Sequence, residues 1–193
     1  QWYNKENARL QSIKDKQKLS KTLTKRQARL LRKRENRVRD YLGKTAKKII
    51  NYCLEHNIGN LVLGKNKGFQ QKSNLGKVNN QIFVQMPFYK LQQKLEYQCK
   101  IYGIDMIEQE ESYTSKASFW DKDEIPVYGD SKQHIFSGKR IKRGLYKTSS
   151  GILLNADVNG ALNILRKSNV VSLSGLYSRG ELNTPVRIRV IKN

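Results

Sequence analysis

The sequence has no long apolar run and few cysteines, and each shortage excludes a class of protein. No stretch of about 18 apolar residues exists that could form a membrane-spanning helix. Residues 1–5 have no apolar segment of the kind a secretory signal carries. The chain's two cysteines, Cys53 and Cys99, form neither a disulfide framework nor a four-thiolate zinc site by themselves. Both lie on apolar faces of predicted helices, which indicates core packing. We therefore expect a cytoplasmic protein with no membrane partner.

Acidic residues are also scarce. The 193 residues include 38 Lys+Arg and 16 Asp+Glu, a formal net charge of +22. A charge of this size repels itself in a compact protein unless a polyanion neutralises it, so nucleic acid is the first partner to consider. The carboxylates of the second half gather in two clusters, residues 105–111 and 121–130. Such a cluster is either a divalent metal site or a solvated acidic loop.

The first fifty residues have most of the excess charge, with 17 Lys+Arg and 4 Asp+Glu. Residues 5–57 contain no proline and are predicted to be helical, with a break near residues 19–22, where Ser20 and Thr22 offer N-caps. After the break, closely spaced arginines leave almost no apolar face and few acids to pair with them, which favours contact with phosphates. The candidates there are Arg26, Arg29, Arg32, Lys33 and Arg37.

Strands and helices alternate in the rest of the chain. Gly59 is expected to end the second helix, and strands are predicted at 60–64 and 104–109, with a helix that starts at Pro87 between them. Residues 139–146 and 152–154 are expected to pair as a hairpin, and Asn155 to cap a helix over 156–166. This order predicts an α/β fold with parallel pairing.

Two carboxylates lie where such folds place their ligands. Glu111 follows the strand 104–109, and Asp157 lies in the first turn of the helix that Asn155 caps. Carboxylates at a strand end and a helix start can hold Mg²⁺ for phosphodiester chemistry, although Asp in a first turn is more commonly a capping aid. Further cations, which either contact nucleic acid or only aid solubility, are Lys65, Lys67, Lys116, Arg140 and Arg143.

Three segments resemble one known family. The sequence N-A-D-V-N-G-A-L-N-I-L at 155–165 resembles the last RuvC motif of the transposon-encoded TnpB (OrfB) proteins. Y-T-S-K at 113–116 resembles a second signature of that family, and L-V-L-G-K-N at 61–66 its middle strand. The resemblance covers roughly residues 1–168. It implies an RNA-guided DNA endonuclease, related to Fanzor and the type V CRISPR effectors, whose RNase H-like (RuvC) domain binds Mg²⁺ or Mn²⁺ through an Asp, Glu, Asp set.

The resemblance also implies particular site residues. Typical members carry the middle Glu after the strand at 61–63, where this chain has Gly64. One branch, shared with Fanzor, has this Glu just before Y-T-S instead. Glu111 and Asp157 are therefore the implied catalytic metal ligands, with Glu110 as the weaker substitute. Family members often bind zinc through C-x-x-C pairs after Y-T-S, but this chain has Ala117 at the first such position and no later cysteine, so no zinc is expected. The insertion is expected to keep a ribbon shape by packing on Phe119, Trp120 and Tyr146.

The first RuvC Asp of the family lies upstream of the region matched here. We therefore expect a partial RNase H-like fold that lacks its first three strands and is inactive alone. The expected divisions are a basic helical region (1–59), a RuvC strand–helix–strand (60–116), a degenerate zinc-ribbon-like insertion (117–154), the last RuvC helix (155–168) and a tail (169–193).

Three functions are considered for this sequence. The first is the C-terminal nuclease portion of an RNA-guided endonuclease of a mobile element, associated with the nucleoid. Its partners would be guide RNA and target DNA, and a companion transposase is a further candidate. The second is a nuclease-inactive truncated remnant or derivative that only binds RNA or DNA. The third is a structural basic protein that coats RNA, against which the two motifs argue.

Overall fold

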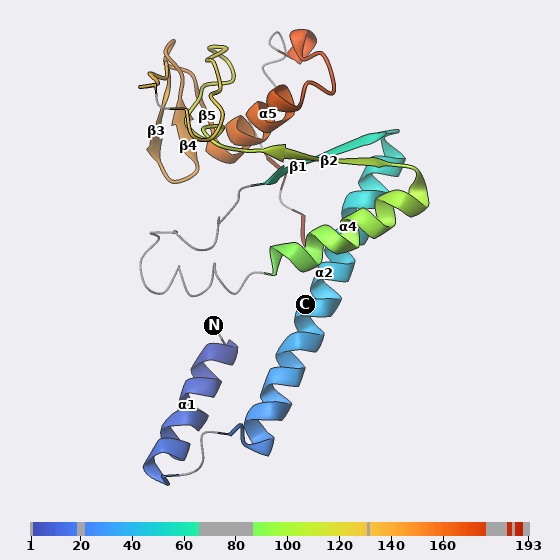
Figure 1. Ribbon diagram of the computed structural model, residues 1–193, viewed down its shortest axis with the longest axis vertical. Coiled ribbons are helices and arrows are strands. Elements are labelled where there is room, and N and C mark those ends of the chain that lie inside the picture. The colour runs from blue at the N-terminus through green and yellow to red at the C-terminus, as the bar shows by residue number, and fades with distance from the viewer. Residues whose placement is uncertain are drawn as a thin grey trace. The chain divides into compact units, whose positions relative to one another are not determined.

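A computed structural model describes residues 2–18, 22–65, 87–130, 132–176, 185–186 and 188–190. The chain folds into two compact units. The helical unit groups residues 1–52, 70–98 and 190–193, and the sheet unit groups residues 53–69 and 99–189. Figure 1 labels their elements.

The helical unit contains α1 (Trp2–Lys16), most of α2 (Lys25–Glu55) and the first part of α4 (Phe88–Tyr102). The expected break between the first two helices is confirmed, but a capping box at Thr24 starts α2, so the expected cap at Thr22 was wrong. Ser20 lies outside the described residues. Gln27 N donates to Thr24 Oγ1 at 3.2 Å, and Thr24 N donates to Gln27 Oε1 at 3.1 Å. The Gln27 side chain also donates to Gln11 Oε1 at 3.1 Å, which ties α2 to α1.

The end of α2 differs from the expectation. The helix stops at Glu55, and Asn57, with φ of 52°, is the residue in the left-handed conformation. Ile58 N then bonds to Cys53 O at 2.8 Å, which closes the last turn. Asparagine tolerates this conformation better than other non-glycine residues, so the expected role of Gly59 as the C-terminal cap was wrong.

Two parallel strands, β1 (Asn60–Lys65) and β2 (Asp105–Glu110), lie side by side in the sheet unit (Figure 1). Their register pairs Asn60 with Asp105 and Lys65 with Glu110. The helix α5 (Ala156–Ser168) contacts both strands. Both strands, their parallel pairing and this helix were expected from the sequence.

A second, antiparallel sheet contains β3 (Lys139–Lys142), β4 (Leu145–Lys147) and β5 (Leu153–Asn155) in that order. The single strand expected over 139–146 is in fact two strands, because the chain turns at Gly144, where φ is +76°. The expected hairpin pairing survives between β4 and β5. Tyr146 and Phe119 are completely buried, as the packing argument required.

Gly138 is needed for this packing. A Cβ at this position would lie 2.6 Å from Tyr146 Cε1 and 2.7 Å from the backbone oxygen of Lys147.

After α5, the chain continues to a short 3₁₀ helix, η1 (Ser174–Leu176). The chain is thus a mixed α/β protein, and none of its described helices is long and apolar enough to cross a membrane.

Candidate functional site

Glu111 places its carboxyl group directly above β1. The backbone continues the β1–β2 pairing, since Glu111 N donates to Lys65 O at 3.3 Å. A Cβ on Gly64 would come within 2.8 Å of Ile164 Cδ1, and closer still to Glu111 Oε2. The glutamate side chain therefore fills the space that a side chain at position 64 would need, and only glycine leaves room for it.

The environment of this carboxyl group disfavours its charged form. Burial, together with the negative charge of Glu110, raises the pKa of Glu111 above the usual glutamate value. Among the described residues, the structure shows no donor bound to the Glu111 side chain. A partly buried carboxylate with no such partner is stabilised by a cation that binds to it.

Glu110, the alternative ligand, is already engaged. Its Oε2 accepts a hydrogen bond from Lys167 Nζ at 2.5 Å, and its Oε1 accepts one from Ser112 N at 2.6 Å. Partial burial would raise the pKa of Glu110, but the bonds from Lys167 and Ser112 outweigh it and hold the pKa below its usual value. Lys167 also donates to Pro126 O at 2.9 Å, so the ion pair is part of the packing. Of the two neighbours, Glu111 is the one whose oxygens remain available.

Asp157 lies in the first turn of α5, as expected. The Asn155 side chain caps the helix by accepting from Asp157 N at 2.9 Å and Val158 N at 3.1 Å. The Asp157 side chain is 86% exposed, and its nearest described cation is Arg140, whose Nη2 lies 3.7 Å from Oδ1. A solvated pair at this distance contributes little to stability, so the carboxylate is free to take another partner.

Two asparagines join the helix of Asp157 to the segment of Glu111. Asn159 and Asn163 are completely buried and lie one turn apart on α5. Asn159 accepts from Phe119 N at 3.0 Å and donates to Ala117 O at 2.8 Å. Asn163 donates to Thr114 O at 3.0 Å and to Ala117 O at 2.7 Å. We call these four bonds the asparagine clasp.

The clasp holds a segment that is also bonded back to the glutamate. Thr114 donates to Glu111 O from its hydroxyl at 2.8 Å and from its amide at 3.3 Å. Tyr113 has φ of 64°, a conformation unfavourable for a residue with a large side chain. Sequence reasoning missed the two asparagines. Their signal was the spacing of Asn155, Asn159 and Asn163, which places three amides on one helix face.

The second acidic cluster contains structural groups. The Asp123 carboxylate accepts from Ser118 N at 2.8 Å, from Ser137 N at 3.0 Å and from the Ser137 hydroxyl. Asp121 accepts from Ser149 N at 3.0 Å and Ser149 Oγ at 2.5 Å. These bonds join loops of the insertion. Within the described residues, no group of three His, Cys, Asp or Glu side chains is placed to hold a metal ion, so the structure does not assemble a complete triad.

The described candidates for nucleic-acid contact fall in two places, on α2 and in the sheet unit. On α2, Lys33 Nζ and Arg37 Cζ lie over the Trp2 ring, at 5.6 and 4.8 Å from its centroid. Arg26 lies 3.9 Å from Glu6, and Arg29 and Arg32 are exposed on the same helix. In the sheet unit, Lys65 pairs with Glu108, Lys116 lies over the Tyr113 ring, and Arg143 is exposed in the turn after β3. Lys67 lies outside the described residues.

Two family models match separate parts of this chain. The model OrfB_IS605, described as a probable transposase, matches residues 1–70. A second model, described as a Cas12f1-like TNB domain, matches residues 88–164. The first match includes α1, α2 and β1, and the second extends from α4 through most of α5. The fold and the matched regions therefore define a transposase-related protein.

A solved structure gives the same relationship. The cryo-EM structure of a Cas12f1–sgRNA–target DNA complex contains a chain that matches 88% of this one, with a TM-score of 0.56 and 20% sequence identity. At this identity the likeness shows a shared fold. This chain spans 41% of that chain's length. Among the curated proteins none matches significantly. The motifs and the two family models together relate this chain to the TnpB/OrfB transposases.

Proposed function

We propose that this chain is the nuclease portion of a transposon-associated, RNA-guided DNA endonuclease with a RuvC-like arrangement of catalytic carboxylates. The two family-model matches and the fold shared with Cas12f1, solved with sgRNA and target DNA, support this proposal. Guide RNA and target DNA are the proposed partners, and the nucleoid is the proposed location. The companion transposase remains a prediction from the sequence.

The observation that carries the proposal is the Glu111 carboxyl group, held above Gly64 at the C-terminal end of β2. It is partly buried, its pKa is raised, and no described side chain neutralises it. Carboxylate oxygens are the donors that Mg²⁺ and Mn²⁺ prefer, so the residues present fit a divalent ion. When bound, such an ion lowers the pKa of water and stabilises charge on a phosphate.

The other residues of the site have separate roles. Asp157 would hold the same ion from the start of α5, where the helix N-terminus stabilises a negative charge. Arg140, 3.7 Å from Asp157, would move to the substrate phosphate once an ion neutralises the aspartate. The asparagine clasp fixes the segment after Glu111 to the helix of Asp157, so the two ligands keep one relative position.

The test is metal binding, with cleavage as a second measurement. Electron paramagnetic resonance counts free Mn²⁺ in a titration of the 193-residue chain. Glu111→Gln and Asp157→Asn should each weaken Mn²⁺ binding by at least about tenfold. Glu110→Gln is the matched control and should bind as the wild type does. Equal loss in all three variants, or in Glu110→Gln alone, would refute the assignment.

A second candidate function is nucleic-acid binding without cleavage. It is favoured by one observation, that the described residues contain no group of three potential metal ligands. The two functions separate in a cleavage assay on the full reading frame that encodes this chain. A nuclease cleaves target DNA with Mg²⁺ and loses cleavage in Asp157→Ala while it keeps RNA binding. A binding protein shows no cleavage in either form.

A further inference from the structure

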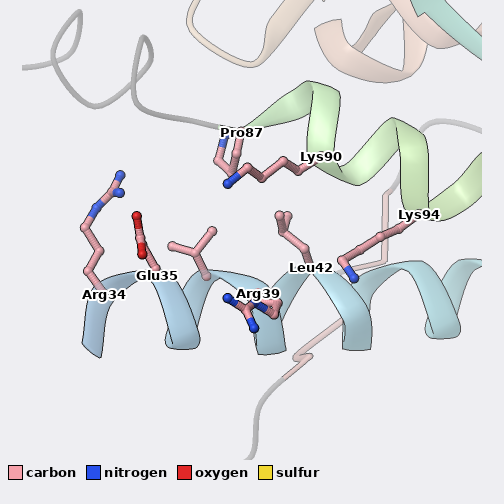
Figure 2. A pocket seen from close by; sticks show the side chains of 8 residues that line it. Arg34, Glu35, Arg39, Leu42, Pro87, Lys90 and Lys94 are labelled. Atoms are coloured by element: carbon pink, nitrogen blue, oxygen red, sulfur yellow. The ribbon is translucent and has the colours of Figure 1, made fainter. Parts of the chain in front are cut away.

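A groove with a strongly basic lining lies between α2 and α4, within the helical unit (Figure 2). Its volume is about 210 Å³. Three cationic side chains face it with no described partner of opposite charge: Arg39 from α2, and Lys90 and Lys94 from α4. Arg34 is a fourth cation in the lining, and Glu35 is the single carboxylate.

This grouping of charge is unfavourable in the protein alone. Solubility requires only that cations be exposed, and it is served best when acids lie between them. Here two helices present cations to the same space, where like charges repel one another. Lys94 is partly buried, so solvent screens its charge less than it would at an open surface. An anion in the groove would remove this repulsion.

The basic groove continues into an apolar hollow of about 540 Å³. The two spaces share Val38, Leu42 and Pro87. Two aromatic rings line the apolar part and remain accessible, since Tyr41 is 46% exposed and Phe88 is 43% exposed. A free phosphate would use only the cations. A duplex would also leave the rings without contact, because its bases are already stacked.

We propose that this groove binds the backbone of a single-stranded nucleic acid, with Arg39, Lys90 and Lys94 on phosphates and Tyr41 stacked on a base. Cations that follow a backbone beside accessible aromatic rings are the chemistry that binds single strands. The proposal rests on the proposed function for the kind of partner, but it uses none of the carboxylates of the nuclease site. RNA and DNA share this chemistry, and the experiment distinguishes them.

The test measures fluorescence anisotropy of labelled strands of about 15 nucleotides, one RNA and one DNA of the same sequence, and of the DNA duplex. EDTA is present throughout, so binding is measured without cleavage, and loss of the nuclease assignment would leave this result unaffected. Lys90→Gln/Lys94→Gln removes two cations of the groove. The matched control is Lys47→Gln/Lys48→Gln, which removes two exposed lysines of α2 that do not line it.

The groove variant should bind single strands at least about fivefold more weakly than the control, and its slope of log K against log salt should fall by about 1.4. The strand that shows the larger difference, RNA or DNA, is the ligand. Tyr41→Ala should weaken binding while Tyr41→Phe keeps it, because stacking needs the ring and not the hydroxyl. Circular dichroism confirms that each variant is folded.

Three results would overturn the proposal. The first is equal affinity in the groove and control variants, which would mean that the lysines act only through net charge. The second is a loss of duplex binding as large as the loss for single strands. The third is displacement of the bound strand by polyglutamate at the same charge concentration, which would indicate an acidic protein partner.

Discussion

Replacing Asn159 by alanine tests whether the asparagine clasp holds the sheet unit together. The substitution removes the bond from Phe119 N at 3.0 Å and the bond to Ala117 O at 2.8 Å. Ala117 O keeps its bond from Asn163 Nδ2 at 2.7 Å. Losing the bond from Asn159 to this oxygen therefore has the smaller cost, about 1 kcal/mol. Removing the acceptor of a buried amide costs more, about 2 kcal/mol. The expected decrease in the free energy of unfolding is therefore about 3 kcal/mol.

Urea unfolding followed by tryptophan fluorescence measures this change. Trp2 and Trp120 are the two tryptophans of the chain, and Trp120 packs against the core of Tyr146, Leu154 and Ala156. In a Trp2→Phe background, emission therefore reports on the sheet unit alone. Hydrogen exchange of residues 113–119 gives a second measurement, and their protection should fall with the stability.

Asn51→Ala is the matched control, because Asn51 is exposed on α2. Its effect should stay within about 0.5 kcal/mol. If Asn159→Ala loses less than about 1 kcal/mol at an unchanged m-value, the two bonds of Asn159 do not stabilise the unit, and the prediction is refuted.

Three further predictions concern single substitutions. Gly64→Ala should displace the Glu111 carboxyl and weaken Mn²⁺ binding as strongly as Glu111→Gln does, and unchanged affinity in the resonance titration would contradict the placement of that side chain above β1. Gly138→Ala should lower the free energy of unfolding by at least about 2 kcal/mol, because the new Cβ meets Tyr146 and a backbone oxygen that cannot rotate away; urea unfolding measures it, and a neutral result would show that the loop moves freely. Asp121→Asn should reduce the acid sensitivity of the fold. Partial burial raises the pKa of Asp121, but hydrogen bonds from serines outweigh it and lower this pKa overall. The stability that Asp121 contributes is therefore present above the usual aspartate pKa and is lost as the pH falls through the lowered value. Unfolding curves from about pH 5 down to pH 2 should therefore be flatter in the variant, and parallel curves would contradict the assignment.

Elements whose signals are local could be predicted from the sequence. The strand β1 is a short apolar run that includes Gly64, β2 begins two residues after Gly103, and Asn155 marks the start of α5 by its capping chemistry. The errors were also local. Asn57 and Gly59 can both adopt the left-handed conformation after α2, and Asn57, which lies nearer the end of the helix, is the one that does. Gly144 has the same freedom within an otherwise strand-like run, so the expected strand became two.

The candidate site was predictable only in part. The family resemblance already favoured Glu111 over Glu110, and the structure adds a physical reason, because Glu110 is paired with Lys167, 57 residues away in the chain. Such long-range ion pairs leave no pattern in a single sequence. The groove between α2 and α4 was hidden for the same reason, because its lysines and arginines come from helices far apart in the chain.

The bonds of Asp121 and Asp123 affect how the insertion responds to oxidants and chelators. They close the loops of the insertion through serine hydroxyls and backbone amides, in a region where the chain has no thiol. This region therefore has no thiolate that an oxidant could modify, and none from which a chelator could remove a metal ion. The two cysteines that exist are buried, and burial raises the pKa of both, so their reactive thiolate form is scarce. A purification with EDTA and without reducing agent should therefore yield the same folded chain.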